Sequence, residues 1–318
     1  MGKEHDTTRR DLLVEVAKLY YERQLSQLEI AHKLGISRSS VSNLLQQCRD
    51  QGIVEIRIND SSTHSQRMQR ELRARFGLTD AVVVPSDPDP EQAKVHVGRA
   101  AAALIEPLLK DRIRIGISWG TTLYELVRHI TPSALEGVEV IQLHGGLGAG
   151  DPEIDGFGLA QKLAEKLRGS YRIMQAPMIV GSVELQKMLV QEPGIAQALQ
   201  SGAGADIALF GIGSNIPGIS SLVRAGYLRE EESIALLSAG AVATVCGLQI
   251  DGRGVVLPSD LNARLVGIDR ETLVRIPTRL GAAAGAQKAD AVLAAIRGQF
   301  VTTLVVDEAI ASKVLASG

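Results

Sequence analysis

The sequence predicts two folded parts in one chain: a small amino-terminal helical module and a larger α/β domain built on a doubly wound parallel sheet. Three observations predict this. A length of 318 residues suits one small and one large domain. Aromatic residues make up only 3% of the chain and there are 32 glycines, so aliphatic side chains must fill the core, as they do around buried parallel strands. Beyond residue 66, short apolar strand candidates alternate with helical stretches.

The first predicted helix ends near Arg23. Its apolar residues recur at helical spacing and give the helix one face that can be buried. These residues are Leu12, Leu13, Val16, Leu19 and Tyr20.

A capping box predicts the start of a second helix. The Ser26 hydroxyl can accept from the Glu29 amide, while the Glu29 side chain reaches back to Ser26. The helix runs through Leu34 and ends at Gly35, because glycine adopts the left-handed conformation without steric cost. The side chains expected to pack are Leu28, Ile30, Ala31 and Leu34.

Ser37 is expected to cap a third helix that ends at Gly52. Its buried stripe is predicted to be Val41, Leu44, Leu45 and Cys48. Residues 53–58 then alternate between apolar and polar side chains, which predicts a short half-buried strand.

A helix, a tight turn and a second helix at this spacing predict a helix-turn-helix, whose last helix shows its first residues to base edges in the major groove of DNA. The side chains off the apolar stripe are hydrogen-bonding types, and Arg, Asn and Gln can each make bidentate contacts to a base. The candidate DNA-binding residues are Gln27, Ser37, Arg38, Ser39, Ser42, Asn43 and Gln46.

The alternative is a helical docking module with a solvated polar face. In its favour, residues 1–58 hold nine Lys/Arg and eight Asp/Glu, a balance of only 9 − 8 = +1, and the whole chain carries −2. Against it, residues 38–47 contain no acidic residue, whereas solvated helix faces are usually rich in Glu and Lys. We therefore expect operator DNA as the partner of residues 1–58.

A polar segment, residues 59–66, is expected to link this module to an effector-binding and oligomerisation domain over residues 67–318. A charged helix should open that domain at 66–76. Six strands are then expected, at 81–85, 113–118, 138–143, 171–176, 206–211 and 302–307. Helices between most of them predict a parallel, doubly wound sheet.

A strand-to-helix turn at Trp119-Gly120-Thr121-Thr122 is the first candidate ligand site. Small and hydroxylated residues let backbone amides and hydroxyls surround an anion at the start of a helix. The alternative is a tight turn in which Thr121 only caps the helix.

Two single residues are further candidates. Asp251 lies in a glycine-flanked loop, where it could accept hydrogen bonds from sugar hydroxyls or simply form a turn. Lys288 stands at the start of an apolar helix over 289–296, where a cation opposes the helix dipole. An anionic ligand would favour a lysine there, and a solvated lysine is the alternative.

No other class of site emerges from the sequence. The six histidines are scattered without metal spacing, and the two cysteines, Cys48 and Cys246, stand in unrelated contexts. We expect no metal, no cofactor, no membrane span and a cytoplasmic location.

Together these segments resemble the SorC-type family of sugar-binding bacterial transcriptional regulators. The resemblance covers about residues 10–316. Its marks are the Tyr20-Tyr21 pair, Gln27, the segments 29–31 and 34–38, Val41-Ser42, the segment 52–54, Gly116 with 119–122, the segment 205–213, Lys288, and the segment 304–308.

The resemblance implies a non-enzymatic effector domain similar to the sugar-phosphate isomerase fold, tetramers on paired operators, and a phosphorylated sugar or a sugar alcohol as effector. A dimer remains an alternative to the tetramer. By position, the effector-binding residues are expected to be Gly120, Thr121, Thr122, Asp251 and Lys288, with Gln142 and Gly145 bordering the same pocket.

The sequence departs from the family pattern at two places near the expected pocket. Gly240-Ala241-Val242 runs into Ala243-Thr244-Val245, where many relatives continue with Gly-Asp, and Ala284-Gly285 replaces a Gly-Gly pair. Both departures put the identity of the effector in question. An isomerase that uses Asp251 or Lys288 is the enzymatic alternative, but it would leave residues 8–58 without a role.

Overall fold

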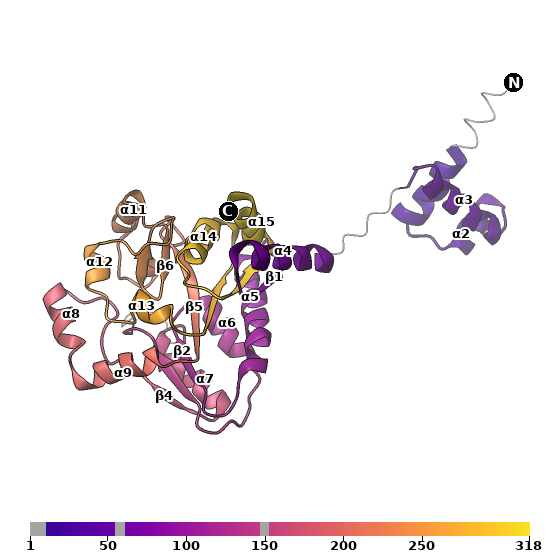
Figure 1. Cartoon of the computed structure of the whole chain (residues 1–318). Helices are drawn as coiled ribbons and strands as arrows, with labels where there is room; N and C mark the ends of the chain where they lie inside the picture. The colour runs from indigo at the N-terminus through magenta and orange to yellow at the C-terminus, as the bar shows by residue number, and fades with distance from the viewer. Residues whose placement is uncertain (1–10, 55–60, 147–152) are drawn as a thin grey trace. The chain divides into compact units, whose positions relative to one another are not determined.

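The computed structural model describes residues 11–54, 61–146 and 153–318 (Figure 1). The chain divides into two compact units, one up to Asp60 and the other from Ser61 to the end. The described residues of the first unit are helical, and the second unit holds the whole sheet.

The first unit packs helical segments around a small apolar core. Residues 11–17 form an α-helix that continues into a π-helical turn, and two further helices follow. These elements are η1 (Lys18–Glu22), α2 (Gln27–Leu34) and α3 (Arg38–Asp50). The centre of the core is formed by Val16, Ile30, Val41 and Leu45, all of which are buried.

The predicted caps of α2 and α3 are confirmed. The Glu29 amide donates to Ser26 Oγ over 3.3 Å, and the Ser26 amide donates to the Glu29 carboxylate over 2.8 Å. Gly35 ends α2 with φ +64°, and Ser37 Oγ accepts from the Ser40 amide at 3.0 Å. These contacts fix the turn between the two helices.

One expectation for the apolar faces is wrong. Leu28 is 56% exposed, because it lies two residues from Ile30, about 200° around the helix. Leu44 packs against the core as expected, although it is only half-buried. The predicted strand at 53–58 lies mainly outside the described residues. Its described part, Ile53 and Val54, is not a strand and packs against Leu13 and Cys48.

The second unit opens with α4 (Ser61–Phe76), so this helix begins five residues before the predicted start at Gln66 and takes up most of the expected linker. Seven strands then form one parallel path in the order β1-β9-β8-β5-β2-β3-β4, and a hairpin of β6 and β7 extends antiparallel from β5. The strands are β1 (Asp80–Val84), β2 (Arg114–Ile117), β3 (Glu139–Gln142), β4 (Ser170–Arg172), β5 (Ile207–Ser214), β6 (Ala243–Val245), β7 (Leu248–Ile250), β8 (Thr278–Ala283) and β9 (Thr303–Asp307).

The six predicted strands are all present, with β4 ending earlier than expected. The sequence analysis missed β8, which is rich in Gly and Ala, and the hairpin, whose strands have three residues each. The stretch before Asp251, expected to be a loop, is strand β7.

Helices cover both faces of the sheet, so the expectation of a doubly wound α/β domain is confirmed. Along β5, Ile207 and Leu209 face one core while Ala208 and Phe210 face the other. The first face packs against α5 (Pro90–Ile105), α6 (Thr121–His129) and α7 (Gly156–Leu167). The opposite face packs against α4, the hairpin, α14 (Ala289–Arg297) and α15 (Glu308–Ser317).

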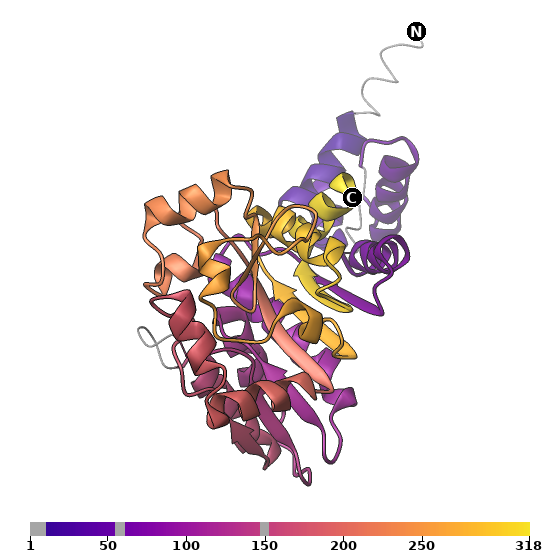
Figure 2. The ribbon, with the colours of Figure 1, turned by 60° about the vertical axis from the view of Figure 1, so that its left-hand side comes forward.

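Figures 1 and 2 show α14 and α15, in yellow, lying together at the carboxyl-terminal end of the colour range, and α15 also contacts α4. The remaining helices are shorter or lie at the periphery of the unit: η2 (Glu106–Leu108), α8 (Val183–Leu189), α9 (Pro193–Ala203), α10 (Ser221–Arg224), α11 (Glu230–Ser238), α12 (Asp260–Ala263), α13 (Arg270–Leu273) and η3 (Ala286–Lys288).

The strand order reverses direction between β2 and β5. From β2 the chain continues outward through β3 and β4, and from β5 it continues in the opposite direction through β8 and β9. In doubly wound sheets, ligands bind in the crevice outside the carboxyl ends of the strands at such a point. The fold therefore places a candidate site after β2 and β5.

Candidate functional site

A cavity of about 120 Å³ lies at this crevice. Its walls come from segments that are far apart in the sequence: the turn after β2, the end of β5, α10, the hairpin, and the end of β8 with η3. The residues with polar side chains that line it are Ser118, Thr121, Thr122, Ser221, Arg224, Thr244, Cys246 and Lys288, and Trp119 adds an aromatic wall.

The first turn of α6 forms one side of the cavity. Gly120 precedes it with φ +126°, a conformation that side-chain-bearing residues rarely adopt, and no side chain caps the helix. The first amides of α6 therefore have no intrahelical partner and point their positive dipole ends outward. Because Thr121 is the first helical residue, the alternative in which it caps the helix is wrong.

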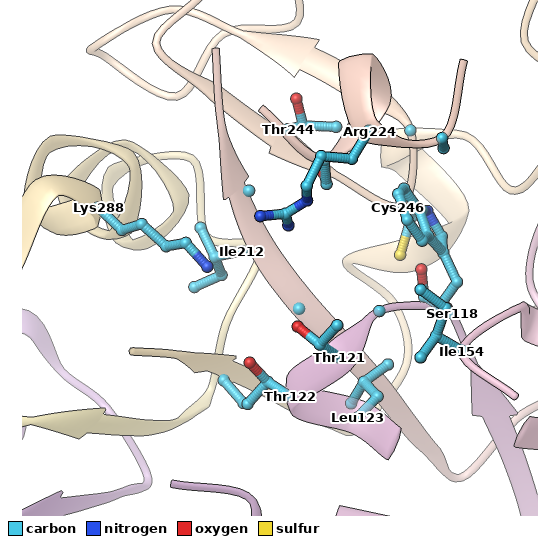
Figure 3. A pocket seen from close by; sticks show the side chains of 18 of the residues that line it. Ser118, Thr121, Thr122, Leu123, Ile154, Ile212, Arg224, Thr244, Cys246 and Lys288 are labelled. Carbon is cyan, nitrogen blue, oxygen red and sulfur yellow. The ribbon is translucent and has the colours of Figure 1, made fainter. Parts of the chain in front are cut away.

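Two cationic side chains converge on the space above this turn. Arg224 extends from the end of α10 and Lys288 from the end of η3, and Figure 3 shows both pointing toward Thr121 and Thr122. Among the residues that the structure describes, none forms a hydrogen bond or an ion pair with either side-chain head group. Two cations that face one cavity and have no partner among the described residues would attract negative charge.

The environment of Lys288 confirms that this end of the cavity is electropositive. Burial, together with the charges of Arg224 and Lys94, lowers the pKa of the Lys288 ammonium to about 8, although the Asp307 carboxylate acts in the opposite direction. Asp307 is itself occupied, because it accepts hydrogen bonds from the backbone amides of Gly285 and Ile310. Lys288 is half-buried, and the desolvation of its ammonium favours the ligand interpretation over that of a solvated lysine.

Another part of the cavity wall brings together the Ser118 hydroxyl, the Cys246 thiol and the His144 imidazole behind them. Ser118 Oγ lies 2.7 Å from Nε2 of His144, and Cys246 contacts Ser118. Burial raises the pKa of the Cys246 thiol to about 12 and lowers the pKa of His144 below its usual range. Both groups are therefore neutral near pH 7, so the array does not form the thiolate–imidazolium pair that nucleophilic catalysis requires.

A buried amide network supports the hairpin wall. The Asn215 amide donates to the Ala241 carbonyl at 2.9 Å and to the Gln249 amide oxygen at 2.6 Å. The Thr244 hydroxyl donates to the same Gln249 oxygen at 3.2 Å. Because these side chains are buried and hydrogen-bonded, they hold the hairpin in one arrangement.

The structure brings four of the seven predicted effector residues together, namely Gly120, Thr121, Thr122 and Lys288. The other three do not line the cavity. Gln142 ends β3, on the far side of β2 from β5, where its side chain lies beside α7 and accepts from the Met174 amide. Gly145 packs against the segment after β4, where a Cβ would lie 2.4 Å from backbone atoms of Ala176 and Pro177.

Asp251 is the third residue outside the cavity. Its carboxylate accepts from the amides of Arg253 and Val255 and pairs with the Arg253 guanidinium at 3.1 Å. These contacts form a turn after β7, and they hold the pKa of the Asp251 carboxyl below its usual value. Its local role is the turn former that the sequence analysis weighed as the alternative.

Four polar lining residues were not predicted from the sequence: Ser118, Ser221, Arg224 and Cys246. Nothing in the local pattern distinguishes Arg224 from the other arginines, and only the placement of α10 over the crevice reveals it. Of the two family departures, Thr244 lines the cavity, whereas Ala284 and Gly285 lie just outside the set of lining residues.

Of the predicted DNA-contacting residues, five lie on α3, Ser37 is its N-cap and Gln27 is the first residue of α2. Ser37, Arg38, Ser39, Ser42, Asn43 and Gln46 are exposed, and Gln27 is half-buried. Gln46 is already engaged, since its amide donates to Asp50 at 2.9 Å and accepts from Arg49. No side-chain hydrogen bond within the described residues holds Arg38, Ser42 or Asn43.

Within the part of the chain that the structure describes, no helix is long and apolar enough to cross a membrane. The same residues include no group of three or more His, Cys, Asp or Glu side chains placed to hold a metal ion.

Two family models match the chain, one to each unit. A winged helix-turn-helix DNA-binding model matches residues 5–55, and a sugar-binding domain model matches residues 60–316.

Curated relatives match over nearly the whole length. The deoxyribonucleoside regulator of Bacillus subtilis is 32% identical over 305 residues, covering 95% of this chain and 96% of the relative. The transcriptional regulator LsrR of an Enterobacter species is 30% identical over 312 residues, covering 97% and 94%. Among solved structures, the full-length sorbitol operon regulator SorC of Klebsiella pneumoniae matches with a TM-score of 0.75 and 26% identity, covering 96% of this chain and 98% of that one.

Proposed function

The chain belongs to the SorC-type family of sugar-binding, helix-turn-helix transcriptional regulators, and from this premise we propose that a phosphorylated sugar or sugar alcohol in the β2–β5 crevice controls its binding to operator DNA. Membership of this family makes the chain a DNA-binding regulator and not an isomerase. The effector class, the contact residues and the assembly are the proposed part.

Two cations, Lys288 and Arg224, carry the effector proposal, because neither has a side-chain partner among the described residues. They face the uncapped first turn of α6, and no carboxylate is among the described residues that line the cavity. A phosphate monoester, with close to two negative charges at pH 7, satisfies both cations and accepts from the helix amides. A neutral ligand would leave two positive charges uncompensated.

The sugar part of the proposal comes from the relatives. One is called a deoxyribonucleoside regulator and another a sorbitol operon regulator, so both names refer to sugar-containing compounds or sugar alcohols. We infer that this chain governs an operon for carbohydrate catabolism.

On the DNA side, we propose that α3 enters the major groove. Arg38, Ser42 and Asn43 are exposed, have no side-chain hydrogen bond within the described residues, and can read base edges. Ser37, Ser39 and Gln27 can contact phosphates or bases. Gln46 would first have to leave Asp50 and Arg49.

We further propose a dimer or tetramer in the cytoplasm. One short recognition helix contacts only a few base pairs, so specific binding needs two half-sites about one helical turn apart or a multiple of that. Both cysteines are free and buried, which suits a reducing compartment. Light scattering at micromolar concentration tests the assembly, and a monomer that binds its operator tightly would contradict it.

Calorimetry with wild type, Lys288→Ala, Arg224→Ala and Thr122→Val tests the effector site. The ligands are inorganic phosphate, D-sorbitol 6-phosphate, D-ribose 5-phosphate and neutral D-sorbitol. Lys288→Ala should weaken the phosphorylated ligands by ~2–5 kcal/mol, because it removes a partly desolvated charge partner that faces the phosphate. It should also abolish the effect of ligand on operator binding, with operator affinity in the absence of ligand nearly unchanged.

Lys313→Ala is the matched control, because Lys313 is an exposed lysine whose ammonium donates to the Ala286 carbonyl outside the cavity. This variant should bind as wild type does. If sorbitol binds as tightly as its phosphate and Lys288→Ala changes neither, the effector is a neutral sugar alcohol and the anion proposal is wrong.

A further inference from the structure

His144 determines the direction of a hydrogen bond in the wall of the cavity. It follows β3, is fully buried, and has a partner at each ring nitrogen. Nδ1 lies 2.9 Å from the carbonyl oxygen of Gly145, and Nε2 lies 2.7 Å from Ser118 Oγ. Since a carbonyl oxygen can only accept, the ring proton must be on Nδ1.

The neutral ring therefore presents a bare Nε2 to Ser118. Burial disfavours the charged imidazolium and holds the pKa of His144 low, so no second proton is present near pH 7. The Ser118 hydroxyl must donate its only proton to Nε2. Ser118 then retains two lone pairs, of which one can accept from the neutral Cys246 thiol and the other is left for a ligand.

We propose that Ser118 is a specificity-determining residue that accepts a hydrogen bond from a hydroxyl group of the effector, and that His144 is the positioning residue that keeps Ser118 an acceptor. This inference rests on the proposed function, since it concerns the sugar end of the same ligand. It predicts that the cavity discriminates against ligands that have the phosphate but lack that hydroxyl.

The two ends of the cavity then have opposite polarity. Arg224, Lys288 and the first amides of α6 are all donors, which suits the phosphate. Ser118 is held as an acceptor at a separate part of the wall, which Figure 3 shows beside Cys246 and away from Lys288. The neighbouring Thr244 hydroxyl donates into the Gln249 network, so its proton is not available to a ligand either.

The test compares single-deoxy analogues of a sugar phosphate. Full-length protein is titrated by calorimetry with D-ribose 5-phosphate and D-sorbitol 6-phosphate, and the tighter ligand is then compared with each of its single-deoxy analogues. In wild type, one analogue should bind about tenfold more weakly than its parent, since one hydrogen bond to a buried acceptor is lost. In Ser118→Ala this difference should fall to about twofold or less, while affinity for inorganic phosphate stays unchanged.

Two further variants separate specificity from stability. Ser233→Ala removes another fully buried serine hydroxyl, which donates to the Asn215 carbonyl away from the cavity lining, so it should lower the melting temperature and keep the tenfold discrimination. His144→Phe removes the acceptor and frees the Ser118 proton. If this variant folds, its preference should shift from the hydroxyl ligand toward the analogue with a methoxy group at the same position, which can only accept.

The outcomes separate this inference from the proposed function. If phosphorylated ligands bind in a Lys288-dependent way but Ser118→Ala keeps the full discrimination, the role of Ser118 is wrong and the anion site stands. Binding of every deoxy analogue as tightly as its parent would also overturn it. If neither sugar phosphate nor inorganic phosphate binds wild type, both proposals fail together.

Discussion

The two candidate recognition surfaces of this chain are built in opposite ways. The α3 face draws its exposed polar residues from Ser37 to Gln46, within one helix and its cap. The cavity draws its lining from Ser118 to Lys288, and its walls meet only because β2 and β5 are neighbours in the sheet. The first surface therefore needs only one helix to form, whereas the second needs the whole α/β domain to be folded.

The two surfaces also differ in their exposure to solvent. Arg38 and Asn43 lie on an exposed face, where water and salt screen their charges and dipoles. Lys288 is desolvated enough to lower its pKa to about 8. Charge at the cavity should therefore respond to pH, whereas the helix face should respond mainly to the sequence of the DNA.

The largest expected contrast is in pH dependence. Only the protonated form of Lys288 pairs with a phosphate, so affinity for a sugar phosphate should fall as pH rises through about 8, by roughly fivefold between pH 8 and 9. Binding near pH 8 should also take up a proton, because a bound anion raises the pKa of Lys288. Calorimetry in buffers of different ionisation enthalpy measures both effects.

Lys288→Arg provides the control, since a guanidinium stays charged in this range and should keep its affinity to pH 9. Operator affinity without effector should stay nearly constant from pH 7 to 9. A wild-type sugar-phosphate affinity that is flat from pH 7 to 9 would contradict the role of Lys288.

A smaller effect is expected for single base contacts. Arg38→Ala or Asn43→Ala should each cost ~1–3 kcal/mol of operator binding, selectively at one base position. Gln46→Ala should cost less, because Gln46 already bonds Asp50 and Arg49. Gel-shift titrations on operators with single substitutions measure this, and an equal loss on random DNA would make these residues phosphate contacts instead.

The smallest expected effect tests whether the stability of the first unit is independent of ligand binding in the second. Ser26→Ala removes the side-chain half of the α2 capping box and should lower the free energy of unfolding of that unit by about 1 kcal/mol. Sugar-phosphate affinity in the second unit should not change. Chemical denaturation followed by circular dichroism, with Ser26→Asp as the cap-preserving control, measures it. A matching loss of effector affinity would show that the two units are coupled through α2.

Much of the fold could be predicted because its signals are short in range. The caps at Ser26, Gly35 and Ser37 bond backbone groups within four residues, and each is present. The strand–helix alternation that predicted the doubly wound sheet also needs only neighbouring residues. Two predictions failed for a different reason. Leu28 was expected in the core, but it lies on the exposed face of α2. The linker was expected to reach residue 66, but α4 already begins at Ser61.

The site could be predicted only in part. The pattern of a strand-to-helix turn was enough to predict Thr121 and Thr122. Lys288 could be predicted because a lysine at the start of a helix opposes the helix dipole. Arg224 could not be found in this way, because a cation at the end of a four-residue helix has no local signature. Asp251 had such a signature, but its carboxylate is occupied by its own turn and by Arg253.

The sequence by itself determined the helix-turn-helix, its caps and the alternating α/β plan, since these depend on hydrogen bonds and side-chain periods that span a few residues. The tertiary structure alone decided that Arg224 and Lys288 converge over the first turn of α6, that His144 takes the proton of Ser118, and that Gln142 and Gly145 lie outside the cavity. The physical reason is that such contacts join segments brought together by sheet order and helix packing, which no local pattern in the chain specifies.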